Sequence, residues 1–283
     1  MTRIDVPEKG LGRVGARPSL PAYIKQIWCY RDFIWFDARS RASAGNYDDS
    51  LGLIWVIINP ILNGLTYFFV FGVLLGTGKG VPNFIAYLLI GVFVFRFTTT
   101  IVSQGSRSLR QGRSLIQAFD FPRATLPIAT GLRELLLTIP TYIVMMLLIL
   151  VMPPAEPITA WWFVIIPVTI LQFFFSTGIA MILARLVARR NDFTHLISVG
   201  LRIWMYLSAV FFSISRFENH PEVYFIMSIN PAFGFLDIVR NGLLYGQGAP
   251  MTSWISVLVS TFVFSIVGLL VFWQAEEKYG DER

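Results

Sequence analysis

Residues Ser106–Leu126 read SRSLRQGRSLIQAFDFPRATL, a polar segment between two long apolar runs. It contains four arginines: Arg107, Arg110, Arg113 and Arg123. A charged residue at the centre of a bilayer costs about 2.5–3.5 kcal/mol on the lenient insertion scale, and loops rich in arginine stay on the cytoplasmic side. We therefore expect this segment to be a cytoplasmic loop, with a short helix along the membrane surface at Ser114–Phe121.

The composition of the chain is that of a membrane protein. Of its 283 residues, 55% are hydrophobic and only 14% are charged, whereas about 25% are charged in an average soluble domain. The net charge of +6 would fit a nucleic-acid partner if it were clustered on a folded domain. The basic residues instead gather in the N-terminal segment and in two short loops between apolar runs, so we expect no nucleic-acid partner.

The apolar runs predict the architecture. Each is close to the roughly 20 residues that a helix needs to cross the hydrocarbon core. An even number of spans, with arginine-rich loops inside, puts both termini in the cytoplasm. The sequence thus predicts an all-α polytopic protein of the cytoplasmic membrane, with a six-span domain over residues 51–273. The runs are Leu53–Leu75, Phe84–Val102, Pro127–Met152, Trp161–Val187, Leu196–Ile214 and Trp254–Trp273.

The segments flanking the six-span domain are polar or amphipathic. We expect residues 1–20 to be a disordered cytoplasmic tail and residues 274–283 to be a second cytoplasmic tail. Within residues 21–50, Ala22–Ala42 has apolar residues at three- and four-residue spacing, interleaved with charges. This pattern predicts an amphipathic helix on the inner leaflet, followed by a turn.

The interval Ser215–Ser253 is long for a loop and carries two short apolar pieces separated by Asn230-Pro231. Neither piece is long enough to span, so we expect a re-entrant helical hairpin on the extracytoplasmic side. Such a hairpin requires protein around its broken backbone. Asp237 and Arg240 are three residues apart on its second limb, a spacing that favours an ion pair.

No pattern of catalytic or metal-binding residues is evident. The two histidines, His195 and His220, have no partner at metal-ligand spacing. Asp48-Asp49 fits either the N-terminal cap of a helix or the carboxylate pair of a membrane glycosyltransferase.

Charged and aromatic residues inside the runs have two open interpretations. Arg133 and Glu134 are adjacent, so we expect them to point to different faces and to pair with other helices. Intramembrane charges either snorkel to the interface or line a polar path. Aromatic side chains either pack in the core or form a surface on which the apolar faces of sugar rings slide. The candidates for a transport path are Phe93, Arg96, Phe97, Arg202, Trp204, Tyr206 and Phe211.

Four segments, in order, resemble the permease subunits of ATP-binding-cassette exporters for polysaccharides and polyol phosphates, which move capsule, O-antigen, teichoic acid or galactan chains. The most specific part is Phe121-Pro122-Arg123 followed by Leu126-Pro127. The segments are LGLIWVIINPIL (Leu51–Leu62), SLIQAFDFPRATLPIA (Ser114–Ala129), RNDFTHLISVGLRIWMYLSAVFFSI (Arg190–Ile214) and INPAFGFLDIVRNGLL (Ile229–Leu244).

The resemblance implies a homodimer around a central path, with a separate cytoplasmic ATPase docked on each copy. ATP and Mg²⁺ would be held by the ATPase, and no cofactor is expected in this chain. Residues Ser114–Phe121 would be the coupling helix, Ala22–Ala42 the interface helix, and the hairpin would close the outer mouth. The expected ATPase-coupling residues are Ser114, Leu115, Gln117, Phe119, Asp120, Phe121, Pro122 and Arg123.

The expected substrate is a glycan linked to polyprenyl pyrophosphate, with a cell-wall galactan among the candidates. Arg31, Arg39 and Arg41 fit contacts to its pyrophosphate, because guanidinium groups bind phosphate in a forked geometry. Binding of anionic membrane lipids explains the same arginines. Two alternative functions remain at this point: a membrane enzyme of lipid-linked glycan assembly, and an ATP-independent flippase.

Overall fold

The computed structural model describes residues 18–44, 54–67, 69–70, 74, 81, 83–151, 154, 156–217 and 219–276. All regular elements within these ranges are helices, which confirms the all-α prediction. The disordered tail predicted over residues 1–20 is wrong at its end, because Leu20 begins a helix and the carbonyl of Pro18 accepts a hydrogen bond from Trp273. Residues 1–17 of that tail, the turn with Asp48-Asp49 and residues 277–283 of the C-terminal tail lie outside the described residues.

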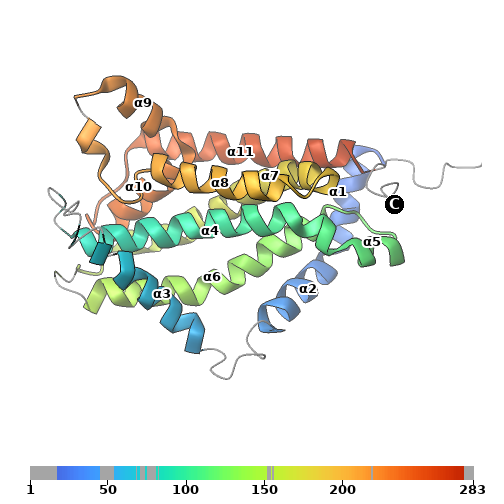
Figure 1. Cartoon of the computed structure of the whole chain (residues 1–283), viewed down its shortest axis with the longest axis horizontal. Coiled ribbons are helices and arrows are strands. Elements are labelled where there is room, and N and C mark those ends of the chain that lie inside the picture. The colour runs from blue at the N-terminus through green and yellow to red at the C-terminus, as the bar shows by residue number, and fades with distance from the viewer. Residues whose placement is uncertain are drawn as a thin grey trace, which may run out of the picture.

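Four long helices run side by side along the long axis of the molecule (Figure 1). They are α4 (Phe84–Gln111), α6 (Thr125–Val151), α7 (Ile165–Arg189, preceded by the 3-10 turn η2, Ala160–Val164) and α11 (Met251–Gln274). Each is long and apolar enough to cross a membrane. In its most apolar window α4 is 72% buried, against 22–44% for the other three, so α4 is the central helix.

Helix α4 extends beyond the predicted second run. The run ends at Val102, whereas the helix continues to Gln111 and ends at Gly112. The difference arises because backbone hydrogen bonds do not require apolar side chains, and residues 103–111 contain no proline. At the other end, the Asn83 side chain accepts a hydrogen bond from the Ala86 amide (3.1 Å) and caps the helix. The first half of the arginine-rich segment is therefore helical.

The predicted amphipathic helix at Ala22–Ala42 consists of two helices. Helix α1 (Leu20–Cys29) and helix α2 (Arg31–Ala44) meet at Tyr30. Helix α1 crosses the end of the bundle, and α2 slants back along α6 (Figure 1). Tyr23 of α1 is fully buried among the ends of α4, α6, α7 and α11. The N-terminal element is thus anchored on the bundle by one face of α1.

The fifth predicted run, Leu196–Ile214, is wrong at its C-terminal end. Helix α8 (Phe193–Leu207) has 15 residues, about 22 Å at 1.5 Å per residue, which is short of a hydrocarbon core of about 30 Å. The chain then turns, with Ala209 at a φ of 51°.

The first predicted run is also only partly helical within the described residues. Helix α3 (Ile54–Tyr67), with 14 residues, covers only part of it.

Two short helices form the predicted hairpin region. Helix α9 (Pro221–Ile229) and helix α10 (Pro231–Leu243) are bent by 84° at Asn230. The Asn230 side chain caps α10 by accepting from the Ala232 amide (3.1 Å). Taken as one broken span, this pair brings the number of candidate spans in the described ranges from four to five.

Helices α7 and α11 touch backbone to backbone at Gly178 and Gly268. A Cβ atom at Gly178 would lie 2.3 Å from the carbonyl oxygen of Phe264. A Cβ atom at Gly268 would lie 2.4 Å from the carbonyl oxygen of Gly178. Small residues at such a contact let two membrane helices approach closely, which is a main source of their association.

The Gly178→Ala substitution is expected to lower the free energy of unfolding by about 1–3 kcal/mol, the usual cost of overpacking. Gly200→Ala in α8 is the matched control, because a Cβ there meets nothing within 4 Å. It should be neutral or stabilising by up to about 1 kcal/mol through helix propensity. Thermal unfolding in detergent measures the stability of both variants. If the two substitutions changed stability equally, the backbones of α7 and α11 would not be in close contact at Gly178.

Candidate docking surface and polar helix face

The arginine-rich segment ends in a short surface helix, α5 (Arg113–Ala118), at the end of the bundle where α1 crosses (Figure 1). The predicted helix Ser114–Phe121 stops earlier, because the backbone of Phe119 is extended. Phe119 is 66% exposed and lies between Ala118 and Asp120, which are also exposed. The exposed members of the predicted coupling set form what we call the docking surface: Ser114, Gln117, Phe119 and Asp120.

The other predicted coupling residues point inward. Leu115 is half-buried, whereas Phe121 and Pro122 are buried. The Phe121 ring packs against the rings of Tyr30 and Phe33, with centroids 6.4 and 5.8 Å apart. These side chains anchor the docking surface and are not part of its exposed face.

Arg123 joins this anchor to the C-terminal end of α11 through Glu276. The Arg123 amide donates to Glu276 Oε1 (2.9 Å), and its guanidinium donates to the Glu276 carbonyl oxygen. The Tyr23 hydroxyl donates to Glu276 Oε2 (2.6 Å) and accepts from the Ala124 amide (3.3 Å). Burial raises the pKa of the Glu276 carboxyl above its usual range, and the hydrogen bonds from Arg123 and Tyr23 oppose that rise.

Sequence analysis did not identify Glu276. It is 153 residues from Arg123 and 253 residues from Tyr23 along the chain. No local pattern links residues at such separations, and Glu276 reads as part of a charged tail. The single weak signal is a charge placed directly after an apolar span.

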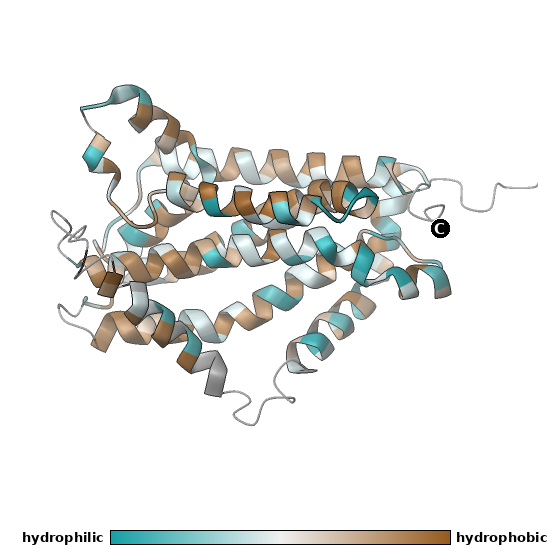
Figure 2. Cartoon of the chain, viewed as in Figure 1, coloured by the Kyte–Doolittle hydropathy of each residue, from teal (hydrophilic) through white to brown (hydrophobic). Residues whose placement is uncertain are grey.

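The second feature is a polar face on α4, the most buried spanning helix. Between Ala86 and Leu109, every residue that is not buried is polar. These residues recur every three or four positions, so they share one side of the helix. Figure 2 shows the change from apolar to polar colouring along α4. The face comprises Arg96, Thr99, Thr100, Ser103, Gln104 and Arg107.

The hydroxyls of Thr99 and Thr100 donate to the carbonyl oxygen of Arg96, at 2.9 and 2.7 Å. Of this face, sequence analysis identified only Arg96 as a path candidate. The available signal was the helical spacing of polar residues from Thr99 to Arg107. This spacing was overlooked because a spanning segment is recognised by its average hydropathy, which does not distinguish one side of the helix from the other.

The predicted path residues fall into two groups. Phe93, Phe97 and Phe211 lie in the buried core of the single chain. Trp204 is half-buried; its ring packs edge-on against Phe95, with centroids 5.7 Å apart, and its Nε1 donates to Asn230 Oδ1 (2.9 Å). The exposed members are Arg96, Arg202 and Tyr206. A role in a transport path stays a prediction for all seven.

The arginines predicted to bind a pyrophosphate or anionic lipid lie on α2. Arg31 and Arg39 are exposed, and the Arg31 guanidinium lies 5.8 Å from the Trp28 ring centroid. Arg41 is half-buried and donates from Nε to Asp37 Oδ1 (2.8 Å). Arg31 also lies 3.8 Å from an Asp32 carboxylate oxygen, but that pair is exposed, whereas the Arg41–Asp37 pair is shorter and half-buried.

The structure corrects two expectations about charged pairs. Arg133 and Glu134 form an ion pair with each other, with 3.8 Å between Nη1 and Oε1. Among the described residues, the expected interaction with another helix is limited to the electrostatic effect of Arg96 of α4 on Glu134. Arg240 makes no ion pair with Asp237 within the described part of the chain. Asp237 accepts hydrogen bonds from Ser253 (2.6 Å) and from the Asn241 amide (3.0 Å) instead.

Arg240 is buried and binds backbone carbonyls. Its Nη1 donates to Ala209 O (3.0 Å), and its Nη2 donates to Val210 O (3.0 Å) and Tyr87 O (3.3 Å). The guanidinium also lies over the Tyr87 ring, 3.4 Å from its centroid. Arg240 thereby satisfies carbonyl groups in the turn that follows α8.

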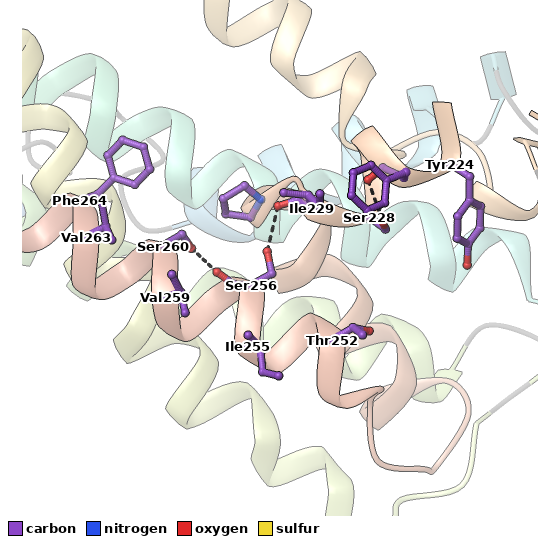
Figure 3. A pocket seen from close by; sticks show the side chains of 12 residues that line it. Tyr224, Ser228, Ile229, Thr252, Ile255, Ser256, Val259, Ser260, Val263 and Phe264 are labelled. Atoms are coloured by element: carbon purple, nitrogen blue, oxygen red, sulfur yellow. Dashed lines mark hydrogen bonds between the residues drawn. The ribbon is translucent and has the colours of Figure 1, made fainter. Parts of the chain in front are cut away.

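A groove of about 830 Å³ lies between α9 and α11. Its lining is apolar apart from hydroxyls, and Figure 3 shows the hydroxyls of its serines, Ser228, Ser256 and Ser260, bonded to carbonyls of the chain itself. Ser256 donates to Ile229 O (2.9 Å), and Ser260 donates to Ser256 O (2.6 Å). The groove therefore has no charged group for a sugar phosphate. Among the described residues, no cluster of His, Cys, Asp or Glu could hold a metal ion.

Comparison with known proteins agrees with this arrangement. The family model described as ABC-2 type transporter matches residues 40–244. The O-antigen export system permease protein RfbA of Myxococcus xanthus is 22% identical over 264 residues, which cover 92% of this chain and 96% of that protein. A protein of the same name from Klebsiella pneumoniae is 26% identical over 235 residues, covering 81% of this chain and 86% of that protein. The match over residues 40–244 spans well over half of the sequence, and the chain therefore belongs to the ABC-2 type transporter family.

Proposed function

We propose that this chain is the membrane subunit of an ATP-driven exporter of a glycan linked to polyprenyl pyrophosphate. Two copies would form a homodimer, and each would dock a separate cytoplasmic ATPase subunit. The polar face of α4 carries the proposal of a transport path. A membrane enzyme of glycan assembly and an ATP-independent flippase are disfavoured by membership of the transporter family.

A polar face on a spanning helix is incompatible with lipid contact along its length. An arginine near the centre of a lipid-exposed helix costs about 2.5–3.5 kcal/mol. Intramembrane charges therefore face a protein partner or a water-filled cavity. Because Arg96 is exposed and the rest of the face is only half-buried in the single chain, we infer that a second copy encloses it and that the two faces together line a hydrophilic path.

The arrangement of the remaining elements supports the proposed six-span topology with a re-entrant hairpin. Helices α3 and α8 would supply the helical parts of the first and fifth spans, and the turn after α8, whose carbonyls Arg240 binds, would complete the fifth crossing. The 84° bend between α9 and α10 fits a hairpin that enters the membrane and returns. Its broken backbone is held by protein groups, namely the Asn230 cap and the Ser256 hydroxyl, which donates to the carbonyl oxygen of Ile229, as a non-helical segment at membrane depth requires.

The substrate class rests on the relatives and on the arginines of α2. The similar proteins are named as O-antigen export permeases, and O-antigen is a polysaccharide. Arg31 and Arg39, exposed on α2, would contact the pyrophosphate at the inner leaflet. A cell-wall galactan is one candidate glycan.

Depleting the chain in cells should increase the intracellular pool of polyprenyl-linked glycan and remove the glycan from the cell surface. Mass spectrometry of lipid extracts measures the pool; an unchanged pool would contradict this substrate class.

Thiol labelling tests the path directly. In a Cys29→Ser background, Ser103→Cys should react with a membrane-impermeant maleimide, because the polar face is wet. Ile266→Cys is the matched control: it is exposed on α11, and both positions lie eight residues from the last residue of their helix (Gln111 and Gln274). We expect labelling of Ser103→Cys and little labelling of Ile266→Cys. Equal labelling would contradict a path along α4.

A further inference from the structure

Three segments that are distant in sequence meet at the carboxylate of Glu276. They are α1 through Tyr23, the loop before α6 through Arg123 and Ala124, and the end of α11 through Glu276 itself. We call the four residues the Glu276 cluster. The Trp273 indole adds a second link between the same ends, because its Nε1 donates to Pro18 O (2.8 Å).

The Glu276 cluster lies directly behind the docking surface. Asp120 of that surface is three residues before Arg123, and its carbonyl oxygen accepts from the Tyr30 hydroxyl (3.1 Å). No helix covers residues 119–124, so this loop gets its position from side chains and not from its own hydrogen-bond ladder. Besides the indirect route through α4, α6 and α7, which packs on α11, these contacts and the apolar packing beside them join the docking surface directly to α1 and to the end of α11.

The contacts of the Glu276 cluster are buried, so the carboxylate loses its hydration and contributes little net stability. Tyr23 and Ala124 are fully buried, and Glu276 is 8% exposed. Burying a carboxylate is unfavourable unless hydrogen bonds compensate it, and apolar residues of similar size stabilise a fold at least as well. Each carboxylate oxygen does have a donor here. Such an arrangement fixes geometry more than it adds stability.

We propose that Glu276, through Tyr23 and Arg123, is a positioning residue that makes the docking surface, α1 and the end of α11 move as one body. The proposal rests on the proposed function, since it concerns how ATPase motion reaches the spans. Without the cluster, the ATPase still docks on Phe119 and Asp120 and hydrolyses ATP, but the motion is not transmitted to α11. The measurable consequence is a lower ratio of glycan exported to ATP hydrolysed.

The test compares tyrosine-to-phenylalanine variants in the reconstituted full complex with its ATPase. Tyr23→Phe removes the hydroxyl that bridges Glu276 and Ala124. Tyr142→Phe is the matched control, because the Tyr142 hydroxyl is equally buried and has no hydrogen-bond partner in the described part of the chain. We expect the export-to-hydrolysis ratio to fall about fivefold or more in Tyr23→Phe, the lower range of allosteric coupling, and to stay unchanged in Tyr142→Phe.

A second variant distinguishes a loss of coupling from a folding defect. Glu276→Gln retains the size of the side chain and should lower the same ratio. The double variant with Tyr23→Phe should be little worse than either single one, because the residues act as a unit. A merely structural role would reduce the yield of assembled complex and leave the ratio per complex at the wild-type value, which would overturn the proposal.

A covalent link gives the decisive control. In the Cys29→Ser background, Tyr23→Cys combined with Glu276→Cys should lose coupling and regain it after treatment with a short bis-maleimide. If the wild-type complex couples ATP hydrolysis to export but the crosslink does not restore coupling to the double-cysteine variant, the Glu276 inference is overturned and the proposed function stands. If the wild-type chain binds no ATPase at all, the proposed function fails and the inference is overturned with it.

Discussion

Replacing Ser103 and Gln104 together by leucine is expected to slow glycan export about thirtyfold while the complex still assembles and hydrolyses ATP. Both side chains lie on the polar face of α4 and are half-buried in the single chain. If each donates one hydrogen bond worth about 1 kcal/mol to the passing glycan or its water, the combined loss of about 2 kcal/mol corresponds to that factor. Apolar residues in a narrow path also favour its dewetting. Export into proteoliposomes, measured beside ATP hydrolysis, gives both rates.

The control for this variant changes an apolar surface in place of a polar one. Ile266→Leu with Val267→Leu changes two exposed apolar residues of α11, a helix that we expect to face lipid along this side. Export should then stay at the wild-type rate. Wild-type export by the Ser103 and Gln104 variant would show that the polar face of α4 faces something other than the glycan.

The largest effect on stability is expected from Arg240→Met. The substitution leaves the carbonyl oxygen of Val210 without the guanidinium donor that now binds it at 3.0 Å, whereas the carbonyl oxygen of Ala209 keeps the Tyr87 hydroxyl as a donor (3.3 Å). A buried carbonyl without a partner costs about 1–3 kcal/mol. Loss of the buried cation–π contact with the Tyr87 ring adds about 2 kcal/mol, so the expected loss is about 3–5 kcal/mol. That is a large share of the 5–15 kcal/mol by which proteins are typically stable. The variant should unfold at a markedly lower temperature in detergent or fail to accumulate.

Arg216→Met is the matched control for Arg240→Met. Arg216 lies in the 3-10 turn η3 (Ile214–Phe217), between α8 and α9, and it is exposed. Its replacement should leave the unfolding temperature unchanged. An Arg240→Met variant as stable as the wild type would contradict the assignment of Arg240 as the group that holds the turn after α8.

The sequence was sufficient for features that depend on composition over a long segment. The four long helices, the exposed α5 and the break at Asn230-Pro231 were all predicted near their observed places. Each depends on apolar length, on arginines that cannot enter hydrocarbon, or on proline. These effects act locally along the chain, so the pattern of residues is enough to reveal them.

What was missed depends on contacts between distant residues. The turn that follows α8 depends on Asn230, which binds the carbonyl of Leu207, and on Arg240, which binds those of Ala209 and Val210. The role of Glu276 depends on Tyr23 and Arg123, which the fold alone brings to it. The polar face of α4 was present in the sequence, but the apolar residues on the buried side of the same helix dominated its average hydropathy.

Co-purification with the ATPase subunit is the measurement that tests the central claim most directly. The full chain and its ATPase would be expressed together, purified through a tag on one of them, and sized by mass photometry. Phe119→Asp places a charge at the exposed centre of the docking surface, and Phe163→Asp places one at a similarly exposed phenylalanine in η2. We predict a complex of two chains and two ATPases that is lost with Phe119→Asp and retained with Phe163→Asp. A chain that purifies without the ATPase, or a complex indifferent to Phe119, would contradict an ATPase docked on this surface.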